Sequence, residues 1–230
     1  MTSINQLKSN AGFFPITEEC VVRFCELMIS DAKEIDILGS WLKEEYYIKD
    51  EIAKAHKVRL GNIEPPYLDS YSEFNWLKAL KDKRVLVVHP FVKTIEKQYT
   101  TNRTRLFANP EFLPVFELLT IKAVQSIGGN SEFDTWFDAL DWMKIEMDKT
   151  DYDVCILGCG AYGLPLAAHA KRTGHHAIHL GGATQLLFGI AGRRWEEQKR
   201  YKGLFNEYWV HPDASERPAN ASTVENGCYW

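Results

Sequence analysis

The stretch from residue 153 to residue 174 constrains the fold of this chain more than any other. It opens with the apolar run Val154–Leu157, continues with Gly-Cys-Gly-Ala-Tyr-Gly at residues 158–163 and then shows a helical pattern up to residue 172. Glycines spaced as G-x-G-x-x-G between a strand and a helix allow a tight turn, and they let backbone N–H groups approach a phosphate. The stretch therefore predicts a strand–turn–helix–strand unit with a ligand site at its turn.

Strand-like and helix-like segments alternate along the whole chain. An unbroken apolar run at residues 84–88 predicts a strand that is covered on both faces. Further strands are expected at residues 35–41, 58–60, 116–123 and 177–180, and helices at residues 18–33, 133–147 and 164–172. Such alternation is typical of an α/β fold, in which a mostly parallel sheet carries helices on both faces in a Rossmann-like arrangement.

The length of the chain, 230 residues, favours one domain with decorations, since domains commonly hold roughly 100–200 residues. The turn-rich residues 61–66 are the best internal boundary. We therefore expect an N-terminal α/β part at residues 1–66, a Rossmann-like core at residues 67–210 and a C-terminal tail at residues 211–230. Together these parts are expected to form a single compact domain.

Composition narrows the classes of partner. A net charge of −4 with 45% hydrophobic residues excludes disorder, and the lack of a basic excess argues against nucleic acid as a partner. No apolar run approaches the ~18–20 residues of a membrane span, and the first ten residues show no secretory pattern. The five cysteines are an odd number without a Cys-x-x-Cys pair. We therefore expect a cytoplasmic protein with no transmembrane segment.

The glycine turn supports three interpretations. Gly158, Gly160 and Gly163 would admit a nucleotide phosphate or a sugar, which is the interpretation we favour, and a turn without a ligand is the second. The third is the cofactor site of a Rossmann oxidoreductase or methyltransferase. A dinucleotide site also needs an acidic residue after the next strand, but that strand ends at residues 179–182 with His-Leu-Gly-Gly. We therefore expect no NAD, FAD or PLP as cofactor.

Polar residues also follow the buried strand at residues 84–88. His89 stands directly at its carboxyl end, where ligands of parallel sheets bind. Arg103 and Arg105, further along, would clamp a diphosphate in bidentate fashion. A solvated helix face explains this basic segment equally well.

A second pair of glycines, Gly181 and Gly182, follows the last predicted strand. Adjacent glycines imply a close backbone approach, and the hydroxyl of Thr184 or the amide of Gln185 could bond a sugar hydroxyl. A helix start without a ligand is a comparable alternative. Four histidines lie nearby in sequence, but they include no i, i+4 pair on one helix and adjacent strand residues point to opposite faces. We assign no residue to a metal site.

The stretch from residue 80 to residue 189 resembles the C-terminal half of the small bacterial glycosyltransferases of the GT-D fold. The shared pattern is a Lys-rich turn with an apolar strand, a basic segment, an amphipathic helix, a strand that ends in Leu-Gly, a helix and a Gly-rich turn. These parts are residues 83–88, 93–107, 133–149, 156–158, 164–170 and 174–182. The whole chain is also similar to a protein family tied to bacterial surface-polysaccharide gene clusters, through residues 10–15, 116–130, 161–166, 177–190 and 227–230.

The resemblance implies transfer of a sugar from a nucleotide-sugar donor to a glycan acceptor, usually with a divalent Mn or Mg ion. Tyr162 is expected to stack on the base or the sugar. On position alone, His89 and His179 are assigned the catalytic role. The expected donor-binding residues are Gly158, Gly160, Tyr162, Gly163, Arg103, Arg105, Gly181, Gly182 and Thr184.

One part of the family pattern is absent. Members usually carry an acidic motif before the segment at residues 10–15, and this chain has no such motif. Either the chain is a shortened form or its acid comes from elsewhere. The missing motif also favours the second hypothesis for function, a non-catalytic nucleotide- or glycan-binding relative that acts as a partner subunit. The aromatic end at residues 228–230 is expected either to cover the site or to pack on another subunit of a homo-oligomer.

Overall fold

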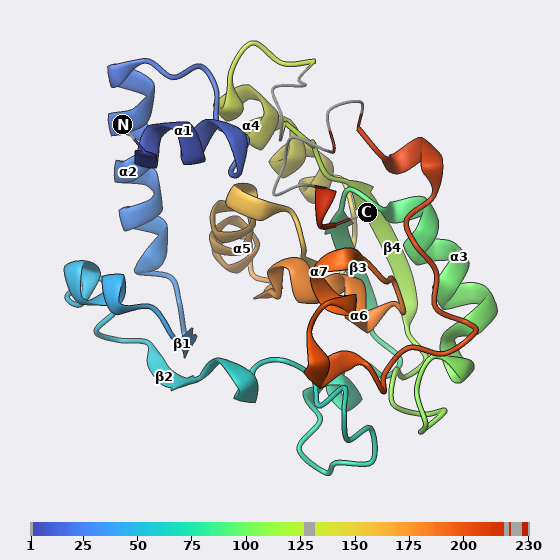
Figure 1. Ribbon diagram of the computed structural model, residues 1–230. Coiled ribbons are helices and arrows are strands. Elements are labelled where there is room, and N and C mark those ends of the chain that lie inside the picture. The colour runs from blue at the N-terminus through green and yellow to red at the C-terminus, as the bar shows by residue number, and fades with distance from the viewer. Residues whose placement is uncertain (1, 127–131, 219–220, 222–226, 230) are drawn as a thin grey trace.

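The computed structural model describes residues 2–126, 132–218, 221 and 227–229 (Figure 1). Four parallel strands form its main sheet in the order β4-β3-β5-β6. A separate pair of parallel strands, β1 and β2, forms a second sheet. The strands are β1 (Ile37–Ser40), β2 (His56–Arg59), β3 (Arg84–His89), β4 (Glu117–Lys122), β5 (Val154–Leu157) and β6 (His176–His179). The predicted α/β fold with parallel strands is confirmed. Residues 127–130 and Trp230, which belong to the segments of family resemblance, lie outside the described residues.

Helices connect and cover these strands. They are α1 (Thr2–Ser9), α2 (Glu18–Ala32), α3 (Val92–Asn102), α4 (Trp136–Asp148), α5 (Gly163–Arg172), α6 (Thr184–Leu187) and α7 (Arg193–Glu196). The hydroxyl of Thr17 caps α2 by accepting from the N–H of Cys20, and Thr135 caps α4 in the same way. The cap at Thr135 shortens the predicted helix at residues 133–147, so Phe133 precedes it. None of the helices in the described part of the chain is both long and apolar enough to cross a membrane.

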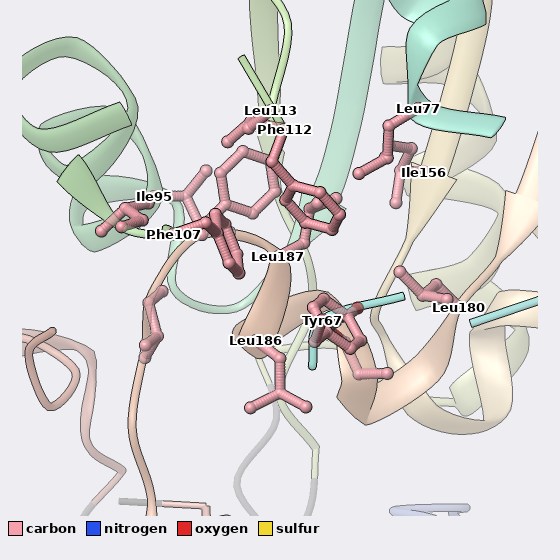
Figure 2. Close-up of a cluster of buried hydrophobic side chains, with 14 of the residues drawn as sticks. Tyr67, Leu77, Ile95, Phe107, Phe112, Leu113, Ile156, Leu180, Leu186 and Leu187 are labelled. Carbon is pink, nitrogen blue, oxygen red and sulfur yellow. Dashed lines mark hydrogen bonds between the residues drawn. The ribbon is translucent and has the colours of Figure 1, made fainter. Parts of the chain in front are cut away.

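Both faces of the main sheet are buried, as the apolar run at residues 84–88 predicted. On one face, Val85, Val87 and Ile156 pack against α3, α6 and the loops around them. Figure 2 shows part of this cluster, with Ile95 of α3 and Leu187 of α6 converging on aromatic loop residues. The alternate strand residues reach the opposite face, where they meet α2, α4 and α5. The structure is therefore a Rossmann-like arrangement of helices on both faces.

The N-terminal part shares the core of the main sheet. Phe13 is fully buried, with its ring centroid 4.7 Å from that of Phe24 and 5.6 Å from that of Trp136. At the end of α5, Arg172 forms an ion pair with Asp31 of α2, Nη2 to Oδ1 at 2.7 Å. Aromatic packing and this ion pair tie residues 1–66 to the Rossmann-like core.

The chain changes direction within the sheet between β3 and β5. From β3 it passes through α3 to β4 on one side, and from β4 through α4 to β5 on the other side of β3. The connections that leave β3 and β5 thus run apart, over opposite faces of the sheet (Figure 1). Such a switch point opens a crevice at the carboxyl ends of its two strands, and ligands of open α/β sheets bind there.

Candidate site at the switch point of the sheet

A cavity of about 120 Å³ lies at the carboxyl ends of all four strands of the main sheet. The segment after each strand contributes lining residues, and both ends of the chain close over them through Asn10, Ala11 and Tyr229. The strand-end lining consists of His89, Pro90, Phe91, Val124, Gln125, Ser126, Gly158, Cys159, Gly160, Tyr162, Gly181, Gly182 and Gln185. Six of the predicted site residues are therefore brought to one place: His89, Gly158, Gly160, Tyr162, Gly181 and Gly182.

His89 is the central polar group of this wall. Its side chain is buried, and its Nδ1 accepts a hydrogen bond of 3.0 Å from the N–H of Phe91. Burial lowers the pKa of His89 to about 3, so the ring is neutral at physiological pH. A neutral ring that accepts at Nδ1 carries its hydrogen on Nε2. His89 therefore offers the cavity an N–H donor.

Gly158 is a glycine because the side chains around it leave no room for a Cβ. A Cβ there would overlap the imidazole of His89 and lie 2.7 Å from the Oγ1 of Thr184. That hydroxyl is fully buried and, within the described residues, has no hydrogen-bond partner. Thr184 is thus placed behind the glycine turn and not among the residues that line the cavity.

Gly160 and Gly181 have a different requirement from that of Gly158. Each has a positive φ, +58° and +60°, and no described atom would lie within 4 Å of a Cβ at either position. The left-handed backbone, and not crowding, explains these two glycines. Both border the open part of the cavity, where a ligand can approach the main chain.

The two histidines assigned a catalytic role do not meet. Register pairs His179 with Leu157, whose side chain faces α4 and α5, whereas His89 follows Val88 and points to the other face. Their strands also have β5 between them, about 10 Å at the usual strand spacing. The ring of His179 lies where a Cβ on Gly163 would sit, and the residue as a whole is exposed. Neither His179 nor Gly163 lines the cavity.

Tyr162 is part of the wall, with its ring held in place. One face stacks on the indole of Trp136, with centroids 4.7 Å apart and planes 7° apart. Its hydroxyl and the Oγ of Ser126 are 2.9 Å apart, within hydrogen-bond distance. Only 2% of the residue is exposed, and burial raises the pKa of its hydroxyl. One ring face is therefore already occupied, which limits the predicted stacking on a base or sugar.

The two arginines expected at the diphosphate do not lie at the strand ends. They follow α3, whose 11 residues extend about 16 Å away from the carboxyl end of β3. Arg103 donates to the carbonyl of Leu113 at 2.6 Å, and Arg105 donates to that of Thr101 at 2.7 Å. Neither residue lines the cavity. The expectation that they clamp a diphosphate there is not met, because α3 carries both residues away from the carboxyl end of β3.

Sequence reasoning missed several lining residues. Gln125 and Ser126 follow the predicted strand at residues 116–123, so the rule that led to His89 could also have found them. Asn10 comes from the N-terminal part of the chain, and no local pattern assigned it to the site. For the aromatic end at residues 228–230, the structure places Tyr229 over the site, one of the two expected alternatives; Trp230 lies outside the described residues.

The lining residues do not fit the Mn or Mg ion that the resemblance implies. These ions prefer carboxylate oxygens, whereas the described lining supplies amides, hydroxyls, an imidazole and backbone groups. No group of three or more His, Cys, Asp and Glu side chains suited to a metal occurs within the described residues. We therefore derive no step through a metal.

A second, apolar cavity of about 280 Å³ lies between α2 and the small sheet. Its wall includes Met28, Leu38, Trp41 and Leu164, and Glu45 is the charged residue in it. The carboxylate of Glu45 accepts from the hydroxyl of Ser40, which lowers its pKa. Glu45 is thus engaged by its own segment, and this cavity lacks the converging polar groups of the strand-end site.

The fold and the strand-end cavity define an α/β protein with a cavity at the switch point of a Rossmann-like sheet. Comparisons with protein-family models, with curated proteins and with solved structures found no match to the chain.

Proposed function

We propose that this protein is a glycosyltransferase that uses a nucleotide-sugar donor and a glycan acceptor in the assembly of a bacterial surface polysaccharide. The observation that carries the proposal is the convergence of four strand ends on one cavity, which has several polar groups in its wall and lies beside a glycine turn. A sugar binds through hydrogen bonds to its hydroxyls, and His89, Gln125 and Ser126 provide groups that can form them. The sequence resemblance of the surrounding segments to GT-D enzymes adds to this support.

The neutral imidazole of His89 suits binding of the donor. Its Nε2–H can donate to a sugar hydroxyl or to a phosphate oxygen, where negative charge grows as the nucleotide leaves. Acting as a base at Nδ1 would break the hydrogen bond from Phe91. In this proposal His89 therefore holds the donor and stabilises the leaving group. His179, on the opposite face, has no role in it.

Cysteine chemistry supports a cytoplasmic location for this activity. Cys20, Cys25, Cys155 and Cys159 are free thiols, and two of them are buried, Cys155 in β5 and Cys159 in the glycine turn. Burial raises the pKa of both thiols, which keeps them protonated and unreactive. Free thiols are typical of reducing compartments.

A second candidate is a non-catalytic relative that binds a nucleotide or a glycan as a partner subunit. The observation in its favour is that no carboxylate occurs among the described residues that line the cavity. A carboxylate is the usual group that activates an acceptor hydroxyl or binds the metal. Binding of a donor without its turnover would distinguish this candidate from the enzyme.

The test is calorimetric titration of the purified chain with UDP and UDP-glucose, with and without Mn, followed by an assay of donor hydrolysis. We expect binding, and we expect His89→Gln to weaken it up to about tenfold, the worth of one hydrogen bond. His176→Gln, at the amino end of β6, is the matched control and should bind normally. Absence of binding to these nucleotides and to the corresponding GDP, ADP and TDP compounds would refute the donor site.

A further inference from the structure

The described lining of the strand-end cavity contains no charged side chain. A nucleotide-sugar donor carries two phosphates, and each brings negative charge that must be balanced where it binds. The uncharged cavity suits the sugar, so the phosphates belong at its edge. Backbone N–H groups of the glycine turn carry no net charge, so a cation beside the cavity would add to the binding of the phosphates, and the arginines after α3 do not supply it.

The segment after β6 brings a different arginine to this edge. Helix α7 begins after Gly192, and a Cβ on that glycine would lie 3.1 Å from the carbonyl oxygen of Tyr229. This close approach seats the C-terminal segment against α7. The N–H of Arg194 donates to the carbonyl of Cys228 at 2.9 Å, and the amide of Gln185 donates to the carbonyl of Tyr229 at 3.1 Å.

The guanidinium of Arg194 is held by two aromatic residues next to the cavity. Its Nη1 donates to the hydroxyl of Tyr229 at 2.6 Å, and its Cζ lies 5.3 Å from the centroid of that ring and 5.5 Å from that of Trp195. Tyr229 lines the cavity, and the ring of Trp195 would contact a Cβ on the lining residue Gly182 at 3.4 Å. Arg194 is itself exposed, so an incoming ligand can reach it.

Lys93 is the competing cation, two residues after Phe91 of the wall. Its Nζ lies 3.1 Å from the Oδ1 of Asp213, and its backbone N–H donates to Glu216 at 2.7 Å. The ammonium of Lys93 is thus bound by Asp213 and, at 3.2 Å, by the hydroxyl of Ser215. A guanidinium, moreover, binds phosphate with a planar fork of N–H donors, which an ammonium lacks.

We propose that Arg194 binds the phosphate groups of the donor at the edge of the strand-end cavity. The donor then lies with its sugar and the phosphate that carries it beside His89, and with the rest of the diphosphate toward α7. This inference rests on the proposed function, because a donor with phosphates is its premise. The inference adds the residue whose positive charge balances the negative charge of the phosphates.

The experiment is calorimetric titration of Arg194→Ala with UDP and with uridine, which lacks the phosphates. We expect the affinity for UDP to fall about 10- to 100-fold, the worth of a charge-assisted hydrogen bond, and the affinity for uridine to change less than about twofold. Arg194→Lys keeps the charge and loses the fork, so it should recover part of the affinity. Arg193→Ala is the matched control, since Arg193 is an exposed neighbour whose Nε is 3.7 Å from a carboxylate oxygen of Glu197.

The outcomes separate this assignment from the proposed function. If the unmodified chain binds UDP and Arg194→Ala binds it equally well while melting at the same temperature, the assignment is wrong and the donor site stands. Equal losses in Arg193→Ala and Arg194→Ala would also overturn it, because they would show a diffuse effect of charge. If the unmodified chain binds no nucleotide diphosphate at all, both proposals fall.

Discussion

The two ends of the same parallel strands are built in opposite ways. At the amino ends, Arg84 of β3 forms an ion pair with Asp153, Nη2 to Oδ1 at 2.9 Å, and a second one with Asp151. The backbone N–H of Arg84 also donates to Asp153 at 2.8 Å. Charges there are matched to one another across neighbouring strands. At the carboxyl ends, His89 and the glycine turn surround a cavity without a charged side chain among its described residues.

The difference shows where binding capacity remains in this fold. At the amino ends, the charged groups bind one another and join β3 to the start of β5. At the carboxyl ends the chain leaves in two directions, and the Oγ1 of Thr184, behind the glycine turn, has no hydrogen-bond partner among the described residues. Buried polar atoms are costly when unpaired, so they indicate either a strained region or a place prepared for a ligand. Changes at the two ends should therefore have different consequences.

The largest effect is expected from Gly158→Ala at the carboxyl end. The added Cβ would overlap the ring of His89 and crowd Thr184, and neither buried side chain can move without disturbing the sheet. We expect a loss of about 3 kcal/mol in the free energy of unfolding, together with loss of nucleotide binding. Urea denaturation measures the first and calorimetry the second. Gly61→Ala is the control, because no described atom lies within 4 Å of a Cβ there. Equal stability of the two variants would contradict the close contact.

A smaller loss in the free energy of unfolding is expected when the pH is lowered, and we expect His89 to cause it. In the unfolded chain a histidine takes up a proton below about pH 6.5, whereas folded His89, with a pKa of about 3, does not. The folded state is therefore penalised as the pH falls from about 6.5 toward 3. Between pH 7.5 and pH 5 this amounts to about 2 kcal/mol. His89→Gln should lose that much less stability over the same interval; identical losses would show that His89 is protonated in the folded protein.

The smallest effect on stability is expected from a change at the amino ends of the strands, and only at low pH. Hydrogen bonds from Arg84 lower the pKa of Asp153 to about 2. The stability that this ion pair contributes is present above about pH 4 and is lost as the pH falls toward 2. Asp153→Asn should therefore flatten the stability profile in that interval alone, while binding at the carboxyl ends stays unchanged. Asp69→Asn, at an exposed loop position, is the control. A binding defect in Asp153→Asn would break the distinction between the two ends.

Part of this site could be predicted because its signals are local. The apolar run at residues 84–88 indicates a strand buried on both faces, and His89 follows it directly, so its place at a strand end needed no further information. The glycine turn was equally visible from its spacing. The same reasoning gave the wrong position for Arg103. Its distance from the end of β3 depends on the length of α3, which the local sequence pattern did not give.

The sequence by itself determined the alternation of strands and helices, the burial of β3 and the strand–turn–helix at residues 153–174, because these follow from the spacing of apolar residues and glycines along a short segment. Only the tertiary structure decided that β3 and β5 are neighbours, that His89 and His179 face opposite sides and that Tyr229 and Arg194 stand beside the cavity. Strand order and the seating of a chain end depend on packing between residues far apart in sequence. The sequence pattern of one segment does not show which other segment packs against it.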